Sequence, residues 1–416
     1  MTDTTNDAPA VSEMERIMAM NFRILDLVFA AEPEMTAARA GATPQASYVE
    51  LAARCPVREI GDKMYSLLRM DDILFVNKHP AVEQGSKYLG SDRPAIPLGL
   101  DGAEHRKFRR LLDPVFTAKR VAPLAAGVRD LANQLIDGFI GEGEADVYQR
   151  WCEPLPSTIF LSIMGLPMGD LEDFIHFKNL TLGNDRAEDQ SIEARMARRG
   201  EAVQWIHNYF QASLDARLAE ANPRDDMIGW LLTTEVEGER LSRQDLLDIL
   251  GLLMIAGLDT VTASLGCFLS YFARHPDHRA RIVADPTLIR SAVEELMRFE
   301  SPVTEGFRIV TEELRLPSGA LLPAGSWAHI SWSAANLDPD YFTNPLDVDL
   351  DRSPNPHIGF ASGYHRCLGS HLARMEMETA LGAWHERIPT YAVRPDTELL
   401  YTGNPRAPHH LPVTWA

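Results

Sequence analysis

Cysteine is scarce in this chain, and the few thiols it has lie far apart. The four are Cys55, Cys152, Cys267 and Cys367, in a chain of 416 residues. No two of them form a C-x-x-C pair, which excludes zinc and dithiol sites of that spacing, and their scatter excludes a disulfide framework. Unpaired cysteines suit a reducing, intracellular environment. We therefore expect a cytoplasmic protein.

The chain also lacks an excess of basic residues and an obvious membrane leader. Its 40 Lys and Arg against 59 Asp and Glu give a net charge of −19, which argues against nonspecific nucleic-acid binding. Residues 1–11 are polar and acidic, unlike a signal peptide. The apolar stretch at 17–31 is interrupted by Arg23 and Asp26, so it is too polar to span a bilayer. We expect a monomer with no membrane anchor and no nucleic-acid partner.

Periodicity and turn signals predict one mainly α domain with a minor β-rich lobe. Residues 1–20 are expected to be a flexible acidic lead, and 21–416 show neither a repeat nor a linker. Helical periodicity dominates from 103 to 216, with breaks at 154–156 and 165–167, and a further helix is expected over 285–299. Strands are expected in a hairpin over 55–68 and between 307 and 330. An irregular loop rich in Asp, Asn and Pro is expected at 336–356.

The longest expected helix starts at a Ser242 cap, runs to Ala273 and ends at a His-Pro pair. It would be about 50 Å long, and because it is apolar on most sides we expect it to be buried. Its middle carries Gly257, Asp259 and Thr260, and polar groups are costly in a buried helix unless they serve a purpose. Gly257 would let the helix open locally and leave room for a small ligand. The alternative is an ordinary packing glycine beside a salt-bridged aspartate.

One thiol stands in a setting that suits metal ligation. Cys367 lies within residues 360–369, FASGYHRCLG, directly before a predicted helix. A helix N-terminus favours thiolate over thiol, while Gly363 and Gly369 let the backbone approach a large flat partner. Phe360 can pack beside the sulfur. These are the requirements of a cysteine that is the single protein ligand of a haem iron; the alternative is a buried, inert thiol.

This run resembles the haem-binding signature of the cytochrome P450 monooxygenases, Phe-x-x-Gly-x-His/Arg-x-Cys-x-Gly. The departure is mild: Ala361 stands where glycine is usual. The resemblance extends from about residue 50 to the end, and it implies a P450-like fold with haem b between the long central helix and the Cys367 loop. It also implies that Gly257 lines an oxygen-binding groove beside the cofactor, that Thr260 hydrogen-bonds dioxygen and that Asp259 helps to deliver protons.

Further charged residues take their meaning from the same resemblance. Glu295 and Arg298 form a Glu-x-x-Arg pair, a spacing that recurs elsewhere in this chain and usually marks a surface ion pair. What distinguishes the Glu295–Arg298 pair is its position in the chain. The resemblance implies that this pair forms, together with Arg352, a buried structural cluster that fixes the loop before Cys367. Haem propionates need cations or hydrogen-bond donors. The residues implied to hold them are His105, Arg109, Arg308 and His365, for each of which the alternative is a solvated basic face.

The function implied is that of a haem-thiolate monooxygenase of the soluble bacterial type. It would insert one oxygen atom from O2 into a hydrophobic small molecule, such as a terpenoid, a steroid or a fatty acid. Electrons would pass from NAD(P)H through a separate reductase and an iron–sulfur ferredoxin. A basic spot on this acidic protein suits the docking of such a carrier. Its members are Arg106, Lys107, Arg110 and Arg366.

Other readings remain open. A haem-thiolate protein could use peroxide, or the chain could be a haem binding or sensing module; the intact Asp259 and Thr260 argue against both. Family position implies a substrate pocket lined by residues 95–100, 181–182, 252–256, 303–307 and 401–402, most of them apolar. Within it, Glu305 would either meet a polar group or face solvent.

Overall fold

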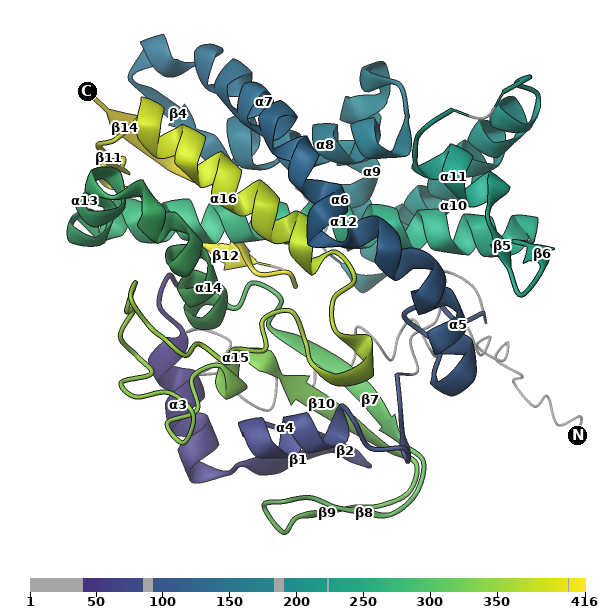
Figure 1. Cartoon of the computed structure of the whole chain (residues 1–416). Coiled ribbons are helices and arrows are strands. Elements are labelled where there is room, and N and C mark those ends of the chain that lie inside the picture. Colours follow the sequence, from purple (N-terminus) through teal and green to yellow (C-terminus); the bar gives the residue numbers. More distant parts are fainter. Residues whose placement is uncertain (1–39, 85–92, 183–190, 223, 403) are drawn as a thin grey trace, which may run out of the picture.

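The computed structural model describes residues 40–84, 93–182, 191–222, 224–402 and 404–416. Within these residues a large helical part lies against a smaller part that holds the main β-sheet (Figure 1). The prediction of a mainly α fold with a minor β-rich lobe is confirmed. The predicted acidic lead at 1–20 lies outside the described residues.

Helices make up most of the described chain. In order they are α3 (Gln45–Arg54), α4 (Met70–Val76), α5 (Gly102–Leu112), α6 (Ala118–Val121), α7 (Ala125–Asp137), α8 (Pro154–Met164), α9 (Leu171–Leu182), α10 (Ile192–Leu218), α11 (Met227–Thr233), α12 (Arg243–Arg274), α13 (Pro276–Ala284), α14 (Ile289–Glu300), α15 (Trp332–Ala335) and α16 (Ser370–Arg387). The last of these follows the Cys367 loop directly. No helix or strand occupies 336–362, as the sequence predicts for 336–356.

The main sheet has five strands in the order β1-β2-β10-β7-β3. These are β1 (Val57–Gly61), β2 (Met64–Leu67), β10 (Ser326–Ser331), β7 (Glu305–Val310) and β3 (Val82–Glu83). The β2–β10 pair is parallel and the others are antiparallel. The predicted hairpin over 55–68 is confirmed as β1–β2.

Smaller sheets complete the β structure. A three-stranded sheet of β11 (Tyr391–Val393), β14 (Pro412–Trp415) and β4 (Glu144–Asp146) ties the C-terminus to the helical part. Three two-stranded hairpins are formed by β12 (Tyr401–Thr402) with β13 (Ala407–Pro408), β5 (Glu235–Val236) with β6 (Glu239–Arg240), and β8 (Leu314–Arg315) with β9 (Leu321–Leu322).

Helix α12 is the axis of the helical part and agrees closely with the prediction. The Ser242 hydroxyl caps its start by accepting from the backbone N–H of Asp245, and His275 follows its last residue. By length and composition it could cross a membrane, but 67% of its most apolar window is buried inside the fold, as in the core helix of a folded domain. Its neighbours include α8, α9, α10, α14 and α16, so it touches helices from most of the chain.

Several predicted boundaries are wrong for local reasons. The break expected at 154–156 is instead the start of α8, because proline is well tolerated in a helix's first turn. A π-helical turn at Tyr148–Cys152 and strand β4 interrupt the helical run expected over 103–216. The helix expected from 285 begins with a 3-10 turn at Pro286–Leu288 and becomes α-helical only at Ile289. The break at 165–167 is confirmed, with Gly165 closing α8 at a φ of 71°.

A close approach in the core yields a stability prediction. A Cβ on Gly266 of α12 would lie 2.8 Å from the Tyr148 ring and 3.1 Å from Pro408. We expect Gly266→Ala to lower the free energy of unfolding by about 1–3 kcal/mol through overpacking. Gly200→Ala is the matched control, because nothing lies within 4 Å of its Cβ position in α10; it should raise stability by about 0.5–1 kcal/mol. Urea denaturation measures both, and equal stability of the two variants would contradict the packing argument.

Candidate active site

The Cys367 loop is closed on itself by one backbone hydrogen bond. The N–H of Cys367 donates to the carbonyl of Phe360 at 2.9 Å, and a 3-10 turn at Gly363–His365 lies between them. Gly363 has a φ of 70°, and a Cβ there would lie 2.2 Å from the Asn77 carbonyl oxygen, so only glycine fits. No described atom lies within 4 Å of the Cβ position of Gly369, which leaves open space beside the cysteine.

Ala361 explains why glycine is usual at its position. Its φ is 56°, in the left-handed region, where a side chain costs roughly 1–2 kcal/mol. Its N–H donates to Ile358 at 2.8 Å, which helps to hold this conformation. The departure from the family pattern is therefore a local strain in the loop rather than a change of its course.

The surroundings of Cys367 do not favour a free thiolate, so its deprotonation requires a metal. Cys367 is exposed, and yet the atoms packed around its loop raise the pKa of the thiol by desolvation. The backbone N–H of Gly369 and the cations Arg109, Arg374 and Arg366 pull that pKa downward without outweighing burial. The helix N-terminus therefore acts in the predicted direction but is not sufficient alone. A metal ion deprotonates a coordinating thiol outright.

The middle of α12 contains a short exposed stretch. Ala256 and Gly257 are exposed, whereas the residues that flank them on the helix are mostly buried. Leu368 and Leu372, just after the cysteine, pack in the same hydrophobic cluster as α12 residues. The chain just after Cys367 therefore packs on the same hydrophobic cluster as α12.

The predicted local opening of α12 is wrong. The helix is continuously α-helical across Gly257. The Thr260 hydroxyl donates back to the Ala256 carbonyl at 2.9 Å, and the Ser264 hydroxyl donates to the Thr260 carbonyl at 2.7 Å. Side-chain hydroxyls thus add hydrogen bonds to this part of the helix, a pattern that often bends helices without breaking them.

Asp259 is held by a buried ion pair that sequence reasoning missed. It is 1% exposed, and Lys178 of α9, also 1% exposed, donates to it at 2.9 Å. Lys178 also reaches Glu153 at 3.2 Å, and Asn179 donates to the same carboxylate. Burial lowers the pKa of Lys178, but Asp259 and Glu153 outweigh it and raise the pKa above its usual value. The signal that could have predicted this ion pair is Lys178 itself, the single lysine among the apolar residues of α9.

Three of the four residues expected to hold propionates lie around Asp101. His365 Nε2 is 2.9 Å from the Asp101 carboxylate, and the rings of His105 and His365 are 4.2 Å apart. Burial, His365 and Arg109 lower the pKa of His105 to about 4, so it is neutral at pH 7. Burial also lowers the pKa of Arg308 to about 10, with Asp101 as the acid that opposes this shift.

Two of these residues retain unused capacity for an anion. His365 Nδ1 is buried with no hydrogen-bond partner. Arg308 is 3% exposed, donates only to the Phe307 carbonyl, and makes no ion pair within the described ranges. A buried cation and a buried orphan nitrogen suit the two carboxylates of a haem. Arg109 differs, because it binds Asp113 at 2.8 Å and the Arg366 carbonyl at 2.8 Å, and so ties α5 to the Cys367 loop.

The structure brings Glu295, Arg298 and Arg352 together as the sequence pattern implied. Glu295 and Arg298 are fully buried, with bonds of 2.7 and 2.9 Å, and Arg352 approaches the same carboxylate at 3.0 Å. Asn355 and the backbone N–H of Asp349 also donate to Glu295. Arg298 in turn donates to the carbonyls of 336, 345 and 347. The cluster therefore fixes the irregular segment that leads to Cys367.

Two positions expected at the pocket have partners within the protein. Glu305 does not face solvent but meets a polar group of the chain itself: it is 6% exposed and pairs with His329 at 3.0 Å, and His329 also bonds Ser66 at 2.8 Å. Tyr401 packs in the core cluster, where its hydroxyl bonds Ser270. That residues 401–402 line a substrate pocket stays a prediction.

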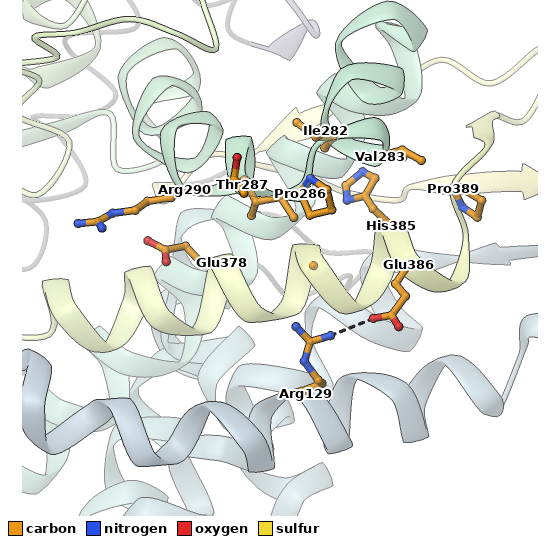
Figure 2. Close-up of a pocket in the computed structure, with 12 residues that line it drawn as sticks. Arg129, Ile282, Val283, Pro286, Thr287, Arg290, Glu378, His385, Glu386 and Pro389 are labelled. Atoms are coloured by element: carbon orange, nitrogen blue, oxygen red, sulfur yellow. Dashed lines mark hydrogen bonds and ion pairs between the residues drawn. The ribbon is translucent and has the colours of Figure 1, made fainter.

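A groove of about 510 Å³ lies away from these residues, between α7, α13, α14 and α16 (Figure 2). An Arg129–Glu386 ion pair crosses one side of it, and Glu378 and Arg290 stand at the other. It contains none of the predicted site residues. Across the described part of the chain, no three His, Cys, Asp or Glu side chains gather to hold a bare metal ion.

Comparison with known proteins agrees with the geometry. The cytochrome P450 family model matches residues 85–384. The chain is 32% identical to the cyclomarin C epoxidase of Salinispora arenicola, over 80% of this chain and 85% of that protein. It is 29% identical to the vitamin D(3) 25-hydroxylase of Pseudonocardia autotrophica, over 84% and 87%.

Solved structures agree as well. A myxobacterial cytochrome P450 in complex with myristic acid superposes with a TM-score of 0.83 at 29% identity, over 92% of this chain and 99% of that one. The bacillaene polyketide synthase P450 of Bacillus subtilis gives a TM-score of 0.82 at 28% identity, over 90% and 97%. With the motif, the fold and the relatives in agreement, this chain belongs to the cytochrome P450 family of haem-thiolate monooxygenases.

Proposed function

We propose that this P450 inserts one atom of O2 into a small hydrophobic molecule of the lipid, steroid or terpenoid type. The observation that carries the proposal is that two features occur together: Cys367 is exposed within its loop, and Ala256 and Gly257 are exposed in the middle of a helix that is mostly buried. Relatives support the substrate class, since they include a vitamin D(3) hydroxylase and a methyl-branched lipid ω-hydroxylase of Mycobacterium tuberculosis. Cytoplasmic location and a monomeric state remain predictions.

The residues fit haem b in distinct roles. Cys367 would supply the thiolate that binds the iron, with Phe360 beside it; Arg308 and His365 would receive the propionates, and His105 would support His365. Arg109 acts indirectly, through the loop carbonyl it binds. When bound, the haem supplies the redox chemistry that activates dioxygen, which a thiolate ligand promotes. The protein supplies position, proton control and exclusion of water.

Asp259 and Thr260 have the chemistry for proton transfer. The Thr260 hydroxyl lies at the open stretch of α12, where its oxygen can accept while its proton is held by the Ala256 carbonyl. Asp259 is buried beside it and anchored by Lys178. For a proton to pass through Asp259 to the Thr260 oxygen, the carboxylate must leave Lys178 and take up a proton from solvent before giving it on, so Lys178 is a positioning residue for the transfer. The presence of both Asp259 and Thr260 favours O2 over peroxide as the oxidant.

An external electron carrier completes the proposal. Lys107 and Arg110 each lie 3.7 Å from Glu237, which partly offsets their charge. Arg110 nevertheless remains exposed, as does Arg366 beside Cys367. A small acidic ferredoxin, reduced by an NAD(P)H-dependent reductase, suits this basic spot on a protein of net charge −19.

The spectrum of the purified protein tests the proposal directly. The reduced protein with CO should show the red-shifted absorption of a thiolate-ligated haem, and Cys367→Ala should abolish it. Absence of that band in the haem-loaded wild type would reject the haem-thiolate assignment. Hydrophobic compounds that shift the spin state of the iron would then narrow the substrate class.

Replacing Thr260 should separate oxygen use from product formation. Proton delivery by a positioned side chain contributes about 10²- to 10⁴-fold to a reaction step, so we expect Thr260→Ala to lower the product formed per O2 consumed severalfold. Thr262→Ala is the control, because Thr262 makes the same back-bond, to Leu258, but is fully buried. Unchanged coupling in Thr260→Ala, or equal losses in both variants, would count against the proton path.

Removing Lys178 should destabilise the fold. Lys178→Met leaves the buried Asp259 charge without this partner, which typically costs about 3–5 kcal/mol. The double variant Lys178→Met/Asp259→Asn should recover part of that loss. Lys107→Met is the control, since its pair with Glu237 is partly exposed and should be worth less than about 1 kcal/mol. Urea unfolding measures the three, and a Lys178→Met protein as stable as wild type would contradict the assignment.

A further inference from the structure

The two adjacent glutamates of α14 serve different parts of the Cys367 loop. Glu295 faces the segment before the loop, as described above. Glu294 faces α16, where Arg374 binds it with two nitrogens, one at 2.9 Å. His357 Nε2 lies 2.9 Å from the same carboxylate. The Glu294 group of residues, comprising Glu294, Arg374 and His357, has no part in the Glu-x-x-Arg pattern, and no sequence motif predicts it.

Arg374 connects this group to the cysteine loop. Its guanidinium lies over the Phe360 ring, 4.2 Å from the ring centre, which is within cation–π range. Phe360 is 9% exposed, and its carbonyl accepts the N–H of Cys367 at 2.9 Å. His357 is on the same side, with its ring 6.2 Å from that of Phe360. A continuous set of contacts thus runs from Glu294 through Arg374 and Phe360 to the cysteine.

Electrostatics points along the same path. Arg374 stacks on Phe360, the residue whose carbonyl accepts the N–H of Cys367, so its positive charge lies beside the cysteine loop. Burial raises the pKa of Glu294, but hydrogen bonds from His357 and Arg374 outweigh this and bring it to about 2. Glu294 is therefore ionised at any working pH, and the Arg374 charge near the sulfur is always partly offset by a fixed anion.

We propose that Arg374, held and partly neutralised by Glu294, is a positioning residue that sets the reduction potential of the haem iron. The inference rests on the proposed function, in that it requires haem iron on Cys367. Reducing the iron adds one electron to the iron–thiolate unit, and a nearby cation stabilises that added negative charge. A carboxylate paired with the cation weakens the effect. The stacking of Arg374 on the Phe360 ring holds the cation at a fixed distance from the rest of the Cys367 loop.

Charge and structure can be separated, because the two partners should act in opposite directions. In Arg374→Gln the cation is lost, so the potential should fall. In Glu294→Gln the cation is no longer offset, so the potential should rise. We expect each single change to alter the ratio of reduced to oxidised iron at a fixed potential by up to about tenfold, which is 59 mV for a one-electron couple. The double variant should lie between the two.

Glu386→Gln is the matched control. Glu386 lies on the same helix as Arg374, about 18 Å further along α16, undergoes the same carboxylate-to-amide change, and pairs with Arg129 at the groove of Figure 2 instead of joining the Glu294 group. Its potential should stay near that of wild type. Arg374→Lys covers the case in which Arg374→Gln does not retain haem, because it keeps the charge and loses only the planar fork; its potential should stay close to that of wild type or fall only slightly.

Spectroelectrochemical titration of the haem-loaded proteins measures these potentials, and thermal unfolding of the same samples records any structural loss. Shifts of the same sign in Arg374→Gln and Glu294→Gln, or shifts no larger than that of Glu386→Gln, would overturn the inference and leave the group as a tie between α14 and α16. Those results would coexist with a normal reduced-CO spectrum. Loss of the thiolate band in the wild type would reject the proposed function instead.

Discussion

The structure depends on one buried carboxylate. Glu295 has no exposed surface, and an ionised group in that position is tolerable only when donors surround it. Arg298, Arg352, Asn355 and a backbone N–H supply them. The guanidinium of Arg298 also donates hydrogen bonds to backbone carbonyls of the 336–347 segment. These bonds fix the backbone path of a stretch that has neither helix nor strand. The position of Cys367 follows from that course.

Helix α12 and the Cys367 loop differ in polarity and in how they are held. Helix α12 is largely apolar and buried on most sides, with a short exposed stretch at Ala256 and Gly257. The Cys367 loop is a polar wall, bound by Arg109 from α5, by Asn77 from the β-rich part and by Arg374 from α16. An apolar wall suits a hydrophobic substrate, and a loop fixed from three elements suits a ligand that must not move.

The parts that could be predicted from sequence are those encoded locally. The ten residues around Cys367 and the cap and apolar length of α12 carry their own signals within a few turns of chain. The partners of Asp259, His365 and Glu294 do not: Lys178 is 81 residues from Asp259, Asp101 is 264 from His365, and Arg374 is 80 from Glu294. Each is a charge whose surroundings exist only after folding. The Glu305–His329 pair was missed for the same reason, since it forms across two strands.

Ala361 has a further consequence for how the loop behaves without its iron. Its methyl group penalises the left-handed conformation seen here, and it also leaves the unfolded chain fewer conformations than glycine would. Bonds that converge on the loop from outside must therefore keep a backbone shape that the residue itself disfavours. Binding of the metal by Cys367 would add one more bond that stabilises this conformation. Without the metal, we expect the loop to leave the conformation more readily than a loop with glycine at this position.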